Sequence, residues 1–337
     1  MSSSQRWLLP SALLAFTAPI AKDEVVFKVA RGTTLVRTLE SSFALELDTM
    51  KVVLDGEEVS SEMFGEFHMR LERQENTVVT DVFEEVSGVR PTRLVRTFDQ
   101  IGGKRHIEVT TGEGAEPQDS EYESALEGKR VTFLWNDESS AFDAAFAEGS
   151  EGDGALLADL REDMDLARFL PSAAVAEGEA WEIEPAAFGD VLDPGGDLAL
   201  VSADDEESAD DEEDSQLRDN LAGKLTGTYR GTREVEGKRL AVIELALDVN
   251  THSESSAAAE DMPDATVTNQ AHATFRLAGE LLWDLEGGHA ASLELTGDNG
   301  LELVQGLSGT LEGEPTEQTQ TMTFSGTARY AMHFERR

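Results

Sequence analysis

The chain has 337 residues, of which 39% are hydrophobic, and its 68 acidic side chains against 27 basic ones give a formal net charge of -41 at pH 7. This charge repels DNA, RNA and anionic membrane surfaces and excludes them as partners, whereas cations, basic proteins and neutral apolar molecules remain possible. The sequence has no cysteine, which excludes disulfides, thiolate metal sites, cysteine nucleophiles and lipid attachment at a cysteine.

The N-terminus has the pattern of a secretory signal peptide over residues 1–21. Arg6 supplies a positive charge, and residues 7–21 are apolar except for Ser11 and Thr17. Cleavage after Ala21 would put Pro19 at a position that prefers a small residue, so an uncleaved anchor or a buried N-terminal helix is the alternative. The pattern predicts a periplasmic or extracellular protein.

The first part of the chain predicts short antiparallel strands. Apolar residues alternate with polar ones, as expected for strands with one dry and one wet face. The apolar parity flips between Leu47 and Met50, which indicates a bulge or a bend. The predicted strands cover residues 25–30, 33–39, 43–54, 67–72, 77–86, 93–101 and 105–110.

Residues 112–124 are polar and predict a loop. A helix is predicted near residues 155–170, where Asp153 or Gly154 can cap it and Pro171 ends it. Its apolar stripe contains Leu157, Leu160, Met164 and Ala167. This is the main helix that the sequence predicts.

Nine carboxylates fall within residues 204–214, and such a block repels itself and stays solvated. We interpret residues 202–216 as an acidic linker or a disordered loop. The block offers weak divalent cation binding, although it lacks the spaced ligand pattern of a calcium loop. The predicted organisation is therefore an N-terminal β-rich domain over residues 23–200 and a C-terminal antiparallel β domain over residues 217–337.

The C-terminal part has the longest alternating runs. Strands are predicted over residues 225–231, 239–249, 273–285, 291–295 and 321–334, with a polar loop near 251–264 and turns at 286–289 and 298–300. In the last strand, Phe324, Tyr330 and Phe334 fall on the dry parity, and Thr323 and Arg329 fall on the wet one. The sequence predicts a mainly β protein whose long antiparallel meander forms curved sheets or open half-barrels.

No motif in the sequence carries a recognisable chemistry, so no catalytic, cofactor-binding or metal-binding residue is assigned. The nucleophile elbow, the phosphate-binding loop and the dinucleotide fingerprint are all missing. The six histidines lack the HxH, HxxxH and HExxH spacings of metal sites; they are residues 68, 106, 252, 272, 289 and 333. Trp135, Trp181 and Trp283 lie in predicted β regions, where we expect core positions and keep ligand contact as the alternative.

One segment resembles a family. Phe169, Leu170 and Pro171, followed by Gly178 to Ile183, resemble an "LP…GxxW" segment of uncharacterised exported bacterial proteins with two β-rich halves. The resemblance implies an exported β protein and supplies no catalytic residue. A long meander with one helix is also similar in outline to the half-barrels of periplasmic lipoprotein carriers.

Two functional hypotheses follow. The first is a non-enzymatic binding or structural module, which becomes a carrier of a lipid or other apolar ligand if a space stays open in the half-barrel. Its partner would be an apolar small molecule or a protein. The second is an extracytoplasmic hydrolase that acts through carboxylates, and only the abundance of Asp and Glu motivates it.

Overall fold

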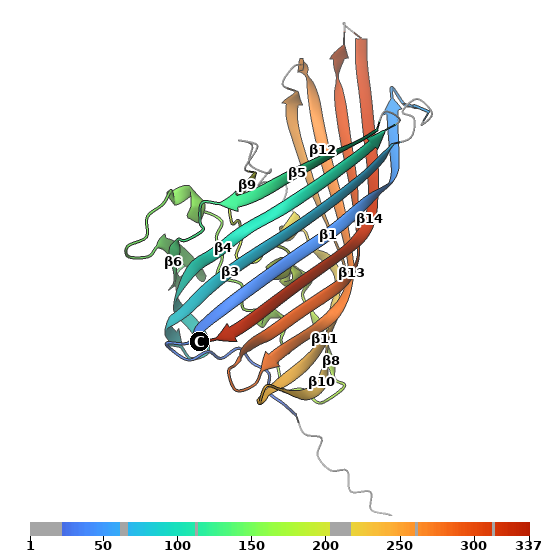
Figure 1. Cartoon of the computed structure of the whole chain (residues 1–337). Helices are drawn as coiled ribbons and strands as arrows, with labels where there is room; N and C mark the ends of the chain where they lie inside the picture. Colours follow the sequence, from blue (N-terminus) through green and yellow to red (C-terminus); the bar gives the residue numbers. More distant parts are fainter. Residues whose placement is uncertain (1–21, 61–66, 112–113, 203–216, 260–261, 312–313) are drawn as a thin grey trace, which may run out of the picture.

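The computed structural model describes residues 22–60, 67–111, 114–202, 217–259, 262–311 and 314–337, which form one large antiparallel sheet (Figure 1). The predicted signal peptide and the acidic run at 204–214 lie outside the described residues. No helix in the described ranges is long and apolar enough to cross a membrane.

The strands of this sheet are long, and several exceed 20 residues. The bounds are β1 (Thr34–Leu54), β2 (Glu57–Glu58), β3 (His68–Ser87), β4 (Arg90–Thr111), β5 (Gly114–Ser124), β6 (Arg130–Asn136), β7 (Ala141–Phe146), β8 (Ala180–Ile183), β9 (Leu200–Ser202), β10 (Ala222–Val235), β11 (Lys238–Ala259), β12 (Met262–Asp284), β13 (His289–Leu311) and β14 (Glu314–Arg336).

The two predicted β-rich parts share this sheet. Its strand order is β7-β6-β4-β3-β1-β14-β13-β12-β11-β10-β8, so β1 of the first part pairs with β14 of the second. The end strands β7 and β8 do not pair with each other in this order, and the sheet stays open. The predicted fold class, a long antiparallel meander that curves into an open half-barrel, is confirmed.

The predicted alternation in β14 is also confirmed. Phe324, Tyr330 and Phe334 are buried, whereas Arg329 is exposed and Thr323 is partly exposed. The buried set faces the concave side of the curved sheet, and the polar set faces the convex side. The bulge that the parity flip in β1 predicts lies between Leu47 and Thr49.

Glycines permit the tight curvature of the sheet. A Cβ atom at Gly279, Gly297 or Gly326 would overlap a backbone carbonyl oxygen of the neighbouring strand. These glycines lie on β12, β13 and β14 and are displaced by two residues from each strand to the next. They form a diagonal line along which the sheet can bend.

Three predicted loops and turns are wrong, because they are parts of strands. Residues 114–124 form β5, residues 251–259 extend β11, and residues 298–300 lie within β13. Each segment has a neighbouring strand in register along its length, and these backbone hydrogen bonds override the local turn preference of Gly, Asn, Asp and Ser. The turn at 286–289 is confirmed, with Gly288 at a φ of 67°.

The segment at residues 25–30, predicted as a strand, instead packs irregularly across one end of the sheet. The buried Trp283 donates a hydrogen bond from its indole nitrogen to the Val26 carbonyl oxygen at 3.2 Å, and its ring meets Phe27 edge to face. Val25 and Val29 join the same core.

The helix predicted at 155–170 is not formed. The structure has only two short 3-10 turns there, η2 (Gly154–Leu157) and η3 (Ala167–Phe169). Asp153 caps η2 as predicted, but Leu166 takes a left-handed φ of 59°. The carboxylates of Asp163 and Asp165 accept hydrogen bonds from the backbone N–H groups of Gly195 and Ala167, which replaces the helical pattern.

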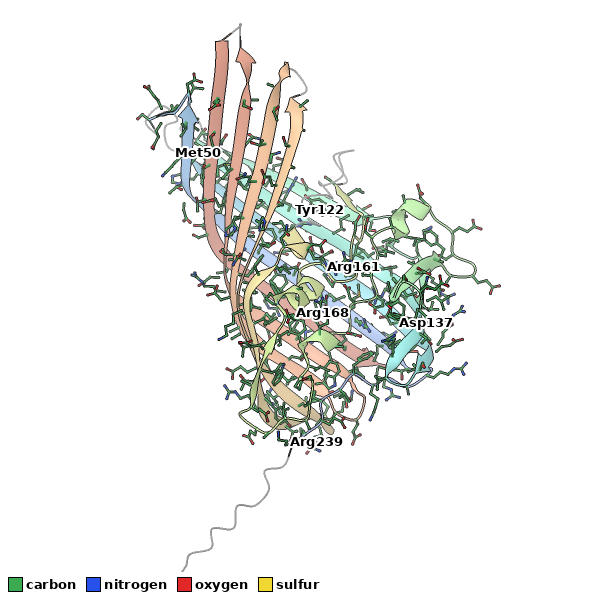
Figure 2. The ribbon with its side chains drawn as sticks, turned by 180° about the vertical axis from the view of Figure 1, so that it is seen from behind. Met50, Tyr122, Asp137, Arg161, Arg168 and Arg239 are labelled. Carbon is green, nitrogen blue, oxygen red and sulfur yellow. The ribbon has the colours of Figure 1, made fainter. Side chains whose placement is uncertain are left out.

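We call residues 147–199 the plug segment, because most of them lie against the concave face (Figure 2). It contains η2, η3, β8, η4 (Pro185–Phe188) and the short helix α1 (Gly189–Leu192). Met164, Leu166, Phe169, Phe188 and Val191 are buried in one core with the strands. The plug segment thus fills part of the half-barrel with side chains, without a long helix.

Candidate functional site

A group of buried charges attaches the plug segment to the sheet. Asp81 on β3 forms ion pairs with Arg37 on β1 at 3.0 Å and with Arg96 on β4 at 2.9 Å, and all three side chains are about fully buried. Arg96 also donates to the backbone carbonyl oxygens of Arg161 and Glu162 in the plug segment, at 3.0 and 3.1 Å. One guanidinium therefore joins two strands and the plug.

Within this group, the two arginines offset the effect of burial on Asp81. Burial raises the pKa of Asp81, but the charges of Arg37 and Arg96 outweigh burial and hold it below the ordinary value. Burial, with Asp165 and Asp163 nearby, raises the pKa of Glu162 to about 7. Because Asp81, Arg37 and Arg96 are shielded from water, they hold the fold together and do not form an accessible active site.

A second charged group holds the other side of the plug segment. Arg218, which lies just before β10, forms ion pairs with Asp163 and with Asp193, the latter at 2.8 Å. Arg168 pairs with the buried Asp190 at 2.8 Å, and burial raises the pKa of Asp190 to about 7.

The aromatic contacts of Phe188 show how far the plug segment reaches. Its ring packs edge to face against Phe275 at 5.4 Å and against Tyr330 at 5.7 Å. The strands continue past these two residues by several more pairs, and Met50 lies near that far end of the sheet (Figure 2).

The concave face beyond this point is apolar and only partly buried. We call it the open apolar face and define it by Leu47, Leu71, Ile107, Leu301, Leu303 and Met322, each of which has intermediate exposure. Neighbours in register include Leu301 with Phe324 and Leu303 with Met322. None of these six belongs to the core that the described part of the plug segment shares with the strands.

A row of side-chain amides, from Gln320, Gln305 and Asn269, borders the open apolar face on the side away from the plug segment. Gln320 lies opposite Gln305 on β13, and Gln305 lies opposite Asn269 on β12. Gln305 donates to the Asn269 side-chain oxygen at 3.2 Å. The apolar surface is therefore bounded by uncharged polar groups on this side.

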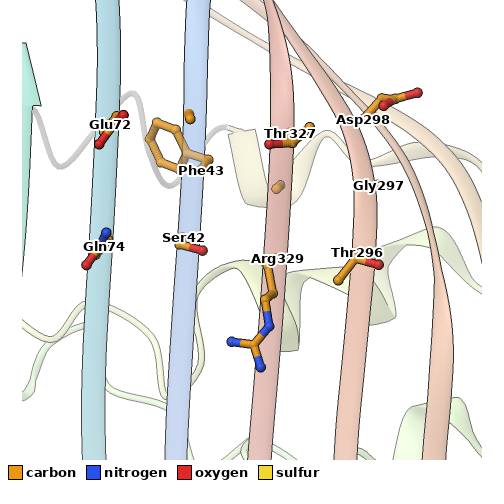
Figure 3. A pocket seen from close by; sticks show the side chains of 11 residues that line it. Ser42, Phe43, Glu72, Gln74, Thr296, Gly297, Asp298, Thr327 and Arg329 are labelled. Atoms are coloured by element: carbon orange, nitrogen blue, oxygen red, sulfur yellow. The ribbon is translucent and has the colours of Figure 1, made fainter.

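The convex face carries a separate open depression of about 440 Å³ over β3, β1, β14 and β13 (Figure 3). Glu72, Asp298 and Arg329 line it. Arg329 is already paired with Glu294 at 3.3 Å and with Glu40 at 3.6 Å, and these exposed pairs are solvated. The arginine that lines this depression therefore does not call for an anionic ligand.

The histidines do not gather into a metal centre in the part of the chain that the structure describes. His252 and His272 lie opposite each other on β11 and β12, a proximity that their sequence separation could not show. His68 and His333 are exposed on strands, as predicted, and so is His272. His289 is buried next to the turn at 286–289, and burial lowers its pKa.

The three tryptophans that lie in predicted β regions differ in their burial and contacts. Trp283 is fully buried, as predicted, whereas Trp181 and Trp135 are partly exposed. Trp181 donates from its indole nitrogen to the Phe169 carbonyl oxygen at 3.1 Å, so the two parts of the "LP…GxxW" segment contact each other. Trp135 packs against Phe142 and under the Arg90 guanidinium, away from the open apolar face.

Sequence reasoning assigned no site residue, and it missed the open apolar face. Leu301 and Leu303 alternate with Glu302 at the same period of two as the core residues of β13, so the sequence does indicate that these leucines lie on an apolar face. What distinguishes them is the limited reach of the plug segment, which no pattern in the sequence shows.

No protein-family model and no curated protein matches the sequence. Solved structures with some similarity include the outer membrane protein OprG from Pseudomonas aeruginosa, at 8% identity and a TM-score of 0.22, covering 91% of this chain and 98% of that one. Another is the secretin-domain β-barrel of InvG from the Salmonella SPI-1 injectisome, at 9% identity and a TM-score of 0.16. That match covers 92% of this chain and 64% of the other. These structural neighbours are outer-membrane and secretin β-barrel proteins, and TM-scores this low carry no argument about function.

Proposed function

We propose that the protein is an exported, non-enzymatic binding module that holds the apolar chain of a lipid on its open apolar face. The observation that carries this proposal is the partial exposure of Leu47, Leu301, Leu303 and Met322 on a concave surface outside the core. Contiguous exposed apolar surface is uncommon on soluble proteins and marks interaction sites.

The two faces of the sheet differ in polarity, and this difference supports the binding of an apolar ligand on the concave side. The convex face carries Glu294, Thr296 and Thr327, which face water. In transmembrane β-barrels the outward side is apolar and the inner side is polar, which is the reverse of this arrangement. An apolar chain would therefore contact the protein from the concave side.

Two features of the chain support export to the periplasm or the extracellular space. Residues 1–21 have the pattern of a signal peptide, and the net charge of -41 favours solubility outside the cytoplasm. The proposal contains no catalytic step, because the buried carboxylates that we found are paired with arginines or attach the plug segment to the sheet.

Native mass spectrometry of the full chain, purified from its own host without detergent, tests the proposal. We expect a co-purifying lipid, and we expect the delipidated protein to bind a fluorescent apolar probe. Leu303→Gln should weaken probe binding about tenfold, a loss of about 1.4 kcal/mol.

Val304→Gln is the matched control, because Val304 is adjacent to Leu303 and points to the convex face. It should leave probe binding unchanged. A delipidated protein that binds no apolar probe, together with no co-purifying lipid, would overturn the proposal.

A further inference from the structure

Two arginines lie directly opposite each other where the open apolar face begins. Arg73 on β3 is in register with Arg105 on β4. Both guanidiniums lie over the ring of the buried Tyr122, with distances to the ring centroid of 5.5 and 5.6 Å. Their shared contact with this ring places both side chains on the concave face.

Like charges directly opposite each other destabilise a sheet unless a counter-charge is present. Arg73 has one, since it pairs with Glu75 at 2.5 Å. Arg105 forms no ion pair with any described residue, and its guanidinium lies over the Tyr122 ring. Within the described part of the chain, Arg105 is therefore the member of the pair without an ion-pair partner.

The neighbours of Arg105 in sequence emphasise this difference. Lys104 and His106 point to the convex face, and each has an acidic partner, Glu121 at 2.9 Å and Asp119 at 2.7 Å. The Arg105 guanidinium differs from these two side chains, because it lies on the same side of the sheet as the open apolar face.

The open apolar face starts two residue pairs away along the same strands. Leu71 precedes Arg73 by two residues on β3, Ile107 follows Arg105 by two residues on β4, and the two side chains are again in register on the same face. Leu45, opposite Leu71, continues this row onto β1. The two guanidinium groups and the apolar row of Leu71, Ile107 and Leu45 thus lie next to each other on the concave surface.

We propose that Arg73 and Arg105 bind the carboxylate of a long-chain fatty acid, whose apolar chain lies along the open apolar face. This inference rests on the proposed function and names its ligand class. Guanidinium groups bind carboxylates through paired, charge-assisted hydrogen bonds. The net negative charge of the protein does not prevent this, because charges beyond about 8 Å are screened at physiological ionic strength.

The test compares hexadecanoic acid with its methyl ester, which keeps the apolar chain and lacks the charge. Each is titrated against the delipidated full chain in competition with the fluorescent apolar probe. We expect the acid to bind about tenfold more tightly than the ester. Arg105→Gln should remove this preference and leave ester binding unchanged, and Arg105→Lys should retain part of it.

Lys104→Gln is the matched control, because it removes one positive charge from the adjacent residue on the convex face. It should leave the preference for the acid intact. Circular dichroism verifies that each variant is folded, and Arg105→Lys carries the test if Arg105→Gln does not fold.

Equal binding of acid and ester, unaffected by Arg105→Gln, would overturn this inference and leave the proposed function in place. Tighter binding of a phospholipid such as phosphatidylglycerol than of the fatty acid would also overturn it, because the head group would then be a phosphate. If neither acid nor ester displaces the probe and the probe itself does not bind, the proposed function fails as well.

Discussion

Strand β13 crosses two regions of the concave face that differ in what covers them. Leu293 and Leu295 are fully buried in the core, whereas Leu301 and Leu303 on the same strand and face are partly exposed. The sequence pattern is the same in both regions. The comparison shows that alternation determines which face is apolar, and that a distant segment determines whether the apolar face is a core or a binding surface.

The largest expected effect is in the covered region, at the buried charges. Asp81→Ala would leave Arg37 and Arg96 buried without a counter-charge, which should cost about 3–5 kcal/mol of unfolding free energy. Urea unfolding measures this cost. Asp99→Ala, at an exposed carboxylate that accepts a hydrogen bond from Thr80, is the control and should stay within about 0.5 kcal/mol. Similar losses from both changes would show that the buried group does not hold the plug segment.

Two leucines on β13 test the comparison directly. Leu293→Ala should cost about 2–5 kcal/mol, because it opens a cavity in the covered core. Leu303→Ala should cost about 1 kcal/mol or less, because the side chain is partly exposed and lies outside the core. Thermal unfolding of the delipidated protein measures both. A cost for Leu303→Ala as large as that for Leu293→Ala would mean that the open apolar face is covered in solution.

The last expected effect depends on pH. Burial raises the pKa of Glu162 from 4.5 to about 7, so the folded state binds this proton more tightly than the unfolded state does. The carboxyl therefore costs stability as pH rises from about 4.5 to about 7, and the full cost is present above that window. Glu162→Gln should raise stability by about 1–2 kcal/mol at pH 8, and by less at pH 5.

Glu162→Gln keeps the backbone carbonyl that accepts from Arg96, so the change isolates the charge. Thermal midpoints at the two pH values measure the difference. A variant that is destabilised at pH 8 would show that the ionised carboxylate is needed by Arg96 or Arg37.

Much of the sheet could be predicted because its strands are amphipathic. The alternation in β14 and the bulge in β1 both follow from period-two patterns, since one face is dry and the other is wet. Strand lengths were underestimated where Gly, Asp, Asn or Ser interrupted the pattern. At Asp298, Asn299 and Gly300, neighbours on both sides supply hydrogen bonds that the local sequence does not reveal.

The plug segment could not be predicted, because its conformation depends on distant partners. Apolar side chains of residues 155–170 do enter the core, since Leu160, Met164 and Phe169 are buried. The intervening Asp163 binds Arg218 and Gly195, which are far away in the sequence. The sequence also does not predict that Arg73 lies opposite Arg105, since only the register of β3 and β4 brings the two residues together.

The pairing of β1 with β14 has a consequence for the folding of the chain. Leu35 pairs with Arg336, so the edge of β1 stays without this partner until β14 has been synthesised. Contacts between such distant residues form slowly, and long unpaired edges invite aggregation. We therefore expect truncation of β14 to yield an insoluble product.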